Sequence, residues 1–228
     1  MTAMGRMLPV VTLRDFSNSA TWYAVSNGQD RPQAVIDMTI DRKLQESIVN
    51  VPPIGPIAAH PDVNEWFISE PHQIKCLLGH VVQFVFDGYI DDDRKADYHR
   101  ALQNLIDLDS SVLAAVEPYV TQYCNETLDL YDDQDRPHVS IQQPSDVWKY
   151  VQFGTEVHIS RRAHGDDEDG IYFSLECNCD WEPEHGLVLV LRDGLEVTKV
   201  GPYDGHLTNS DAYADPNLKN VIFKSFCA

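Results

Sequence analysis

Two patterns of apolar and polar residues divide this chain. Between residues 94 and 126 apolar side chains recur every three or four positions, the spacing that gives a helix one apolar face. In the first helix these are Tyr98, Ala101, Leu102, Leu105 and Ile106, and in the second they are Val112, Leu113, Val116, Tyr119, Val120, Tyr123 and Cys124. The spacing predicts two amphipathic helices that pack on a common core.

The ends of the two predicted helices carry their own signals. Asp91, Asp92 and Asp93 precede the first helix, where carboxylates suit the positive end of the helix dipole. Ser110 stands where it can cap the second helix. Pro118 lies inside the second stripe and lacks a backbone donor, so a kink or break is predicted there.

The C-terminal part alternates with period two instead, as strands do. Thr155, Val157 and Ile159 alternate with polar residues, and a return strand begins at Ile171. A hairpin follows, in which two apolar runs flank Asp193-Gly194, a strong signal for a two-residue turn. These segments predict a four-stranded meander, preceded by a short helix that Ser145 caps and followed by a last strand over residues 221–226.

The predicted turn also fixes a register, with Arg192 opposite Leu195 and Gly186 opposite Gly201. The loops 180–185 and 201–206 then meet at the open end of the hairpin. This corner is the predicted binding site, with no catalytic residue assigned. Its candidate residues are Asp180, Trp181, Glu182, Glu184, His185, Tyr203, Asp204 and His206.

The N-terminal part holds fewer clear elements. Residues 22–26, 34–40 and 81–86 are predicted strands, residues 41–49 a short helix, and the proline-rich stretch 52–61 a loop. Segregated strands and helices favour an α+β fold, with antiparallel sheet, two central amphipathic helices and a C-terminal meander. A polar linker around residues 131–146 suggests an N-terminal lobe at 1–138 and a C-terminal lobe at 139–228.

The charge is strongly acidic, with 17 Lys plus Arg against 36 Asp plus Glu and a net charge of -19. Such a field repels nucleic acid and anionic lipid, and it attracts a basic protein. The simpler interpretation is that it keeps a protein in solution. Five cysteines without regular spacing favour free thiols in a reducing cytoplasm. No secretory signal and no apolar run of about 20 residues is apparent, so a cytoplasmic protein is expected.

Zinc and catalysis are the chemical alternatives at the corner. Cys177, Cys179, His185 and His206 match a common zinc ligand set. Alternation places both cysteines in the apolar row of one strand, which favours buried thiols, and no metal or other cofactor is expected. Glu184, His185, Asp204 and His206 could instead serve a metal-dependent or acid/base hydrolase. The structural interpretation is that these side chains are solvated or bond to loop backbone.

Two segments carry a family resemblance. Residues 175–187 include Trp181-Glu182-Pro183-Glu184-His185-Gly186-Leu187, and residues 199–209 include Gly201-Pro202-Tyr203-Asp204-Gly205-His206-Leu207-Thr208-Asn209. They resemble a family of uncharacterised bacterial proteins with a Trp-x-x-Glu-His-Gly-Leu motif. The family is similar to immunity or accessory proteins encoded near polymorphic toxins. The resemblance implies bacterial origin, a cytoplasmic setting and a binding role, and it transfers no catalytic residue.

Overall fold

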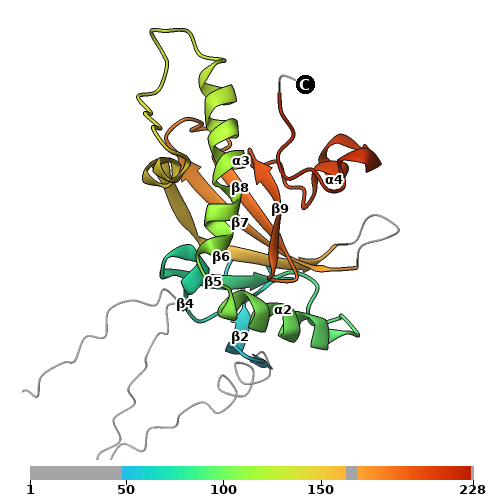
Figure 1. Cartoon of the computed structure of the whole chain (residues 1–228). Coiled ribbons are helices and arrows are strands. Elements are labelled where there is room, and N and C mark those ends of the chain that lie inside the picture. The colour runs from blue at the N-terminus through green and yellow to red at the C-terminus, as the bar shows by residue number, and fades with distance from the viewer. Residues whose placement is uncertain (1–47, 163–168, 227–228) are drawn as a thin grey trace, which may run out of the picture. The chain divides into compact units, whose positions relative to one another are not determined.

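The computed structural model describes residues 48–162 and 169–226, which form a mostly antiparallel nine-stranded sheet (Figure 1). The strands lie side by side in the order β1-β2-β3-β5-β6-β7-β8-β9, and β4 pairs with β5. Their bounds are β1 Val49–Val51, β2 Gly55–Ala59, β3 Phe67–Ser69, β4 His72–Ile74, β5 His80–Phe86, β6 Val151–Arg161, β7 Ile171–Cys179, β8 Leu187–Arg192 and β9 Glu196–Gly201.

Helices α2 (Lys95–Asp107) and α3 (Ser111–Leu128) pack on one face of this sheet (Figure 1). A short helix, α4 (Asn209–Tyr213), follows β9, and the 3₁₀ turns are η1 (Lys75–Leu77), η2 (Pro144–Tyr150) and η3 (Pro216–Leu218). The α+β class, the two central amphipathic helices and the C-terminal meander are therefore confirmed.

The apolar faces of α2 and α3 are those that the sequence predicts. Tyr98, Ala101, Leu102 and Leu105 are buried on α2, and the α3 stripe is buried except for the partly exposed Tyr119. Pro118 does not break α3, because packing of the flanking turns holds the helix where one hydrogen bond is missing.

The predicted helix caps are wrong. The side chain of Ser110 makes no capping hydrogen bond, and the Asp109 carboxylate accepts the backbone N–H of Ser111 at 2.9 Å instead. At the short helix η2, Gln143 and Asp146 form a reciprocal capping box in the place given to Ser145. A carboxylate or amide two or three residues away can serve a helix start as well as the adjacent serine.

β5 and β6 are parallel, with Phe84 opposite Val157, whereas every other pairing in the described sheet is antiparallel. Parallel neighbours need a long crossover, and residues 87–150 provide it with α2, α3 and η2 on one face. The boundary predicted at 138/139 falls within this crossover. It does not interrupt the sheet, since strands from both sides of it pair with each other.

The predicted loop at residues 52–61 is wrong, because most of it belongs to the β1–β2 hairpin. Val51 pairs with Gly55 and Asn50 with Pro56. Pairing of β2 with β3 starts only at Ile57, so Pro56 has no third strand that would need its missing N–H. Proline therefore fits at this place in the sheet.

The bend at Asp193 and Gly194 is confirmed, with φ of 51° and 67°, but the predicted register is wrong. The ladder resumes at the Arg192–Glu196 pair, and the register shifts again between Val190 and Leu191. Gly201 therefore faces Val188 rather than Gly186. The pairing of β8 with β9 is therefore displaced by two residues from the predicted one. Side chains of a strand point to the same face every two residues, so this displacement leaves Val200 facing the core.

Other predictions fall at the ends of the described chain. Residues 221–226 do not form the predicted last strand, although the Val200 N–H donates to the Ile222 carbonyl at 2.7 Å. The predicted strands at 22–26 and 34–40 lie outside the described residues, as does nearly all of the helix at 41–49.

Candidate functional site

The loops 180–186 and 201–206 meet, as predicted, and we call them the corner. The backbone N–H of Tyr203 donates to the carbonyl of His185 at 3.1 Å. The prediction that these loops meet is correct although the predicted register is wrong, because the loops still adjoin neighbouring strands at the same end of the sheet. Sequence reasoning therefore found the place, although not the pairing that builds it.

Glu182 shapes the turn that starts the corner. Its Oε1 accepts the backbone N–H of Glu184 at 2.9 Å and that of His185 at 3.2 Å. The N–H of Gly186 donates to the Glu182 carbonyl at 3.0 Å. On the other side, the buried hydroxyl of Tyr123 donates to the Gly186 carbonyl at 2.8 Å and ties the turn to α3. The Glu182 carboxylate is thus used in folding.

The second loop is held by a buried lysine. The Lys199 side chain is 2% exposed, and its ammonium donates to Asp204 and to the His206 carbonyl, the latter at 3.0 Å. Asp204 also accepts the backbone N–H of His206 at 2.9 Å. Burial lowers the pKa of Lys199, and the Asp204 carboxylate opposes that shift. The Asp204 carboxylate and the backbone of His206, both predicted as binding residues, are therefore used in folding, whereas the His206 imidazole is 47% exposed.

Trp181 is also a structural residue rather than a surface contact. It is 0% exposed and packs edge-on against Tyr123, with ring centroids 5.9 Å apart. Its neighbours Cys177 and Cys179 are buried in the same core, as alternation along the strand predicts. Burial raises the pKa of each thiol to about 12. The corner thus rests on a packed apolar base.

A hollow of about 320 Å³ opens beside this base, where two glycines flank β7. A Cβ on Gly154 would lie 2.2 Å from the Glu176 carbonyl oxygen, and one on Gly186 would lie 2.3 Å from that of Cys177. The neighbouring backbones therefore approach β7 too closely for any side chain. Between these two glycines, the exposed residues Glu176 and Asn178 of β7 line the hollow.

Polar groups from both sides line the hollow. The residues are Gly154, Glu176, Cys177, Asn178, Pro183, Glu184, His185, Gly186 and Tyr203. Tyr203 is 41% exposed. Burial, followed by the Glu176 charge, raises the pKa of Tyr203. Throughout the described part of the chain, no lysine or arginine forms an ion pair with Glu176 or Glu184.

The predicted residues therefore separate into two groups. Glu184, His185 and Tyr203 line the hollow, whereas Trp181, Glu182, Asp204 and the backbone of His206 hold the two loops in place. Asp180 is exposed and accepts the Gln152 amide at 3.0 Å. Sequence reasoning missed Gly154, Glu176 and Asn178. Alternation along β7 could have found the last two, because they are the polar partners of the apolar row.

A second acidic loop adjoins the corner. Residues 129–136 and 176–186 together contain eight carboxylates and one arginine. In the first of these segments, burial and then the charges of Glu182 and Glu184 raise the pKa of Tyr131. Figure 1 shows the segment after α3 at the same end of the sheet as the β7–β8 connection. We call the exposed Asp132, Asp133 and Asp135 the acidic rim.

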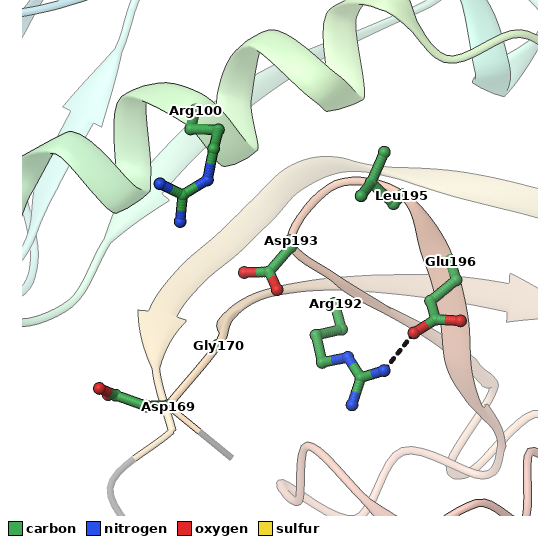
Figure 2. Close-up of a pocket in the computed structure, with 7 residues that line it drawn as sticks. All are labelled: Arg100, Asp169, Gly170, Arg192, Asp193, Leu195 and Glu196. Atoms are coloured by element: carbon green, nitrogen blue, oxygen red, sulfur yellow. Dashed lines mark hydrogen bonds and ion pairs between the residues drawn. The ribbon is translucent and has the colours of Figure 1, made fainter.

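A larger hollow, of about 590 Å³, lies at the other end of β8 and β9 (Figure 2). It holds charges of both signs that compensate each other. Arg192 pairs with Glu196, as the dashed line in Figure 2 marks, and Arg100 pairs with Asp97 at 2.8 Å. Asp169 is bound by Arg94. The corner, with its uncompensated carboxylates, is therefore the stronger candidate for a charged ligand.

The described residues also bear on metal sites and membrane spans. No group of three His, Cys, Asp or Glu residues in 48–162 and 169–226 is placed to hold a metal ion. None of the helices found in these ranges is long and apolar enough to cross a membrane.

Residues 54–207 match the model of a family described as a domain of unknown function, DUF6985. The chain belongs to this family. The match includes the whole hollow, from Gly154 to Tyr203, together with α2 and α3. No curated protein and no solved structure matches the chain.

Proposed function

We propose that this chain is a noncatalytic binding protein that docks on a basic protein partner. The docking surface is its acidic end, by which we mean the corner and the acidic rim together. The observation that carries the proposal is the set of carboxylates without a cationic partner at the corner and the acidic rim. Carboxylates elsewhere in the described chain show the contrast, since Asp92 and Asp97 both form ion pairs with Arg161. Holding several like charges together costs free energy, which a cationic partner would offset.

The resemblance to immunity and accessory proteins supports a finer form of the proposal. In this form the chain is a bacterial, cytoplasmic immunity-type protein, and its partner is a basic toxin. Electrostatic complementarity would serve such a pair by speeding association and by rejecting acidic proteins. A toxin gene beside the gene for this chain would add support.

The test compares two full-length variants that each lose four negative charges. The first carries Asp132→Asn, Asp133→Asn, Asp135→Asn and Glu184→Gln at the acidic end. The matched control carries Asp62→Asn, Glu65→Gln, Glu70→Gln and Asp87→Asn, which are exposed residues near β2, β3 and β5. Each chain is tagged and used to capture proteins from the organism that encodes it, and the captured protein is identified by mass spectrometry.

The expected result is a basic partner that the wild type and the control retain and the first variant loses. With purified partner, the association rate is expected to fall steeply as salt rises. Equal capture by both variants, or an association rate independent of salt, would contradict the proposal.

A further inference from the structure

The hollow is shaped for one side chain rather than for a peptide segment. Its volume of about 320 Å³ lies at the lower end of the range, roughly 300–1,000 Å³, that is usual for ligand sites. Gly154 and Gly186 line it, and at both of them the neighbouring backbone approaches β7 so closely that a Cβ would lie only 2.2 or 2.3 Å from a β7 carbonyl oxygen. Close packing of backbone therefore fixes the position of the two glycine-containing segments that border the hollow.

Its polar groups suit a cation. Glu176 comes from β7 and Glu184 from the turn that follows, so the two carboxylates reach the hollow from different segments. Neither has a lysine or arginine as an ion-pair partner among the described residues. The half-exposed ring of Tyr203 stands at the same hollow and offers an aromatic face, which attracts cations.

Among cations, the hollow favours a guanidinium group. A guanidinium is planar, presents several N–H donors in a fixed fork and stacks on aromatic rings. Carboxylates on two sides and a phenol ring can all bind one such group, whereas an ammonium is more strongly hydrated and lacks the flat surface.

We propose that this hollow takes one arginine side chain of the basic partner, between Glu176 and Glu184 and against Tyr203. The proposal rests on the proposed function, to which it adds a point of contact. The rest of the acidic end would attract the partner, and the hollow would fix where it docks.

The test uses the ¹⁵N-labelled full-length chain and two small probes, Nα-acetyl-arginine methylamide and its neutral citrulline counterpart. The arginine probe is expected to cause saturable shifts of the amide signals of Gly154, Asn178, Gly186 and Tyr203. The citrulline probe has nearly the same shape without the charge, and should bind about tenfold more weakly or worse. Shifts spread over the acidic rim, equal shifts with citrulline, or no shifts would overturn the proposal.

Variants then test each contact. Glu176→Gln with Glu184→Gln should lose the arginine response, whereas Glu65→Gln with Glu70→Gln, which removes the same charge elsewhere, should keep it. Tyr203→Phe retains the ring and should retain binding, and Tyr203→Ala should weaken it about tenfold. Far-UV circular dichroism checks that every variant is folded. Loss with the control pair, or an unchanged response in the first pair, would contradict the assignment.

The two proposals can fail separately. If the probe shifts are absent but the partner is still lost by the variant that lacks Asp132, Asp133, Asp135 and Glu184, the assignment of an arginine to the hollow is wrong and the proposed function stands. If the probe binds as expected but no basic partner depends on the acidic end, the proposed function is wrong.

Discussion

The buried ammonium of Lys199 binds the carboxylate of Asp204, which itself reaches solvent: the side chains are 2% and 34% exposed. The lysine comes from β9 and the aspartate from the loop that follows, so this pair folds the chain back on itself. Its two members are unequal, because only the aspartate can be hydrated when its partner is removed.

We therefore expect Asp204→Ala to be more destabilising than Lys199→Met. Removing the carboxylate leaves a buried ammonium without its charge partner, which costs about 3 kcal/mol or more. Replacing the lysine with Met leaves an aspartate that water can reach. In the double variant the loss should resemble that of Lys199→Met alone. Urea unfolding of the four proteins measures these differences, and equal losses in both single variants would refute this account.

Gly186 and Gly205 provide a matched pair in the corner. Both have positive φ, 60° and 77°, but a Cβ on Gly186 meets backbone at 2.3 Å whereas one on Gly205 meets nothing within 4 Å. Gly205→Ala should lower the free energy of unfolding by about 1 kcal/mol, because an alanine is strained at positive φ but meets no neighbouring atom. Gly186→Ala should cost more than about 2 kcal/mol, because the strands must also move apart. Thermal unfolding of both variants measures the difference. Similar melting temperatures would contradict the close approach of the Gly186 backbone to β7.

Asp146 makes stability depend on acid pH. Its carboxylate accepts from Lys149 at 2.7 Å and from the Gln142 and Gln143 N–H groups at 3.1 Å each, and these bonds, the lysine's first, lower its pKa to about 2. Since the unfolded value is about 3.9, the contribution is complete above that pH and is lost as pH falls toward about 2.

Asp146→Asn should therefore be less stable than wild type at pH 6, with a difference that shrinks between pH 4 and about 2. Urea midpoints at pH 6, 4, 3 and 2 measure it. Asp62→Asn is the control, as Asp62 is exposed and forms no ion pair among the described residues. A difference that stays constant with pH would show that the bonds of Asp146 do not act through its charge.

The four thiols of the described residues are buried and should be unreactive in the native protein. Burial raises the pKa of Cys76 to about 11 and that of Cys124, Cys177 and Cys179 to about 12. Because only the thiolate reacts, alkylation by iodoacetamide at pH 8 should be about a hundredfold slower than in urea, or slower still. Peptide mass spectrometry follows each cysteine. Rapid native labelling of Cys177 would mean that the hollow opens into the core.

The sequence by itself determined what depends on neighbouring residues. The spacing of apolar residues predicted α2, α3 and their buried faces. Alternation along the strand predicted that Cys177 and Cys179 are buried, and the Asp193-Gly194 pair predicted the bend. Such patterns report which side of an element faces the core, because burial of apolar surface acts on each element separately.

The tertiary structure alone decided how the elements meet. It set the two register shifts between β8 and β9, the parallel pairing of β5 with β6, and the close approach of two glycines to β7. It also decided which carboxylates are used in folding, such as Glu182 and Asp204, and which have no lysine or arginine partner among the described residues, such as Glu176 and Glu184. These outcomes rest on hydrogen bonds and charges between segments far apart in the chain, and no local pattern of residues encodes them.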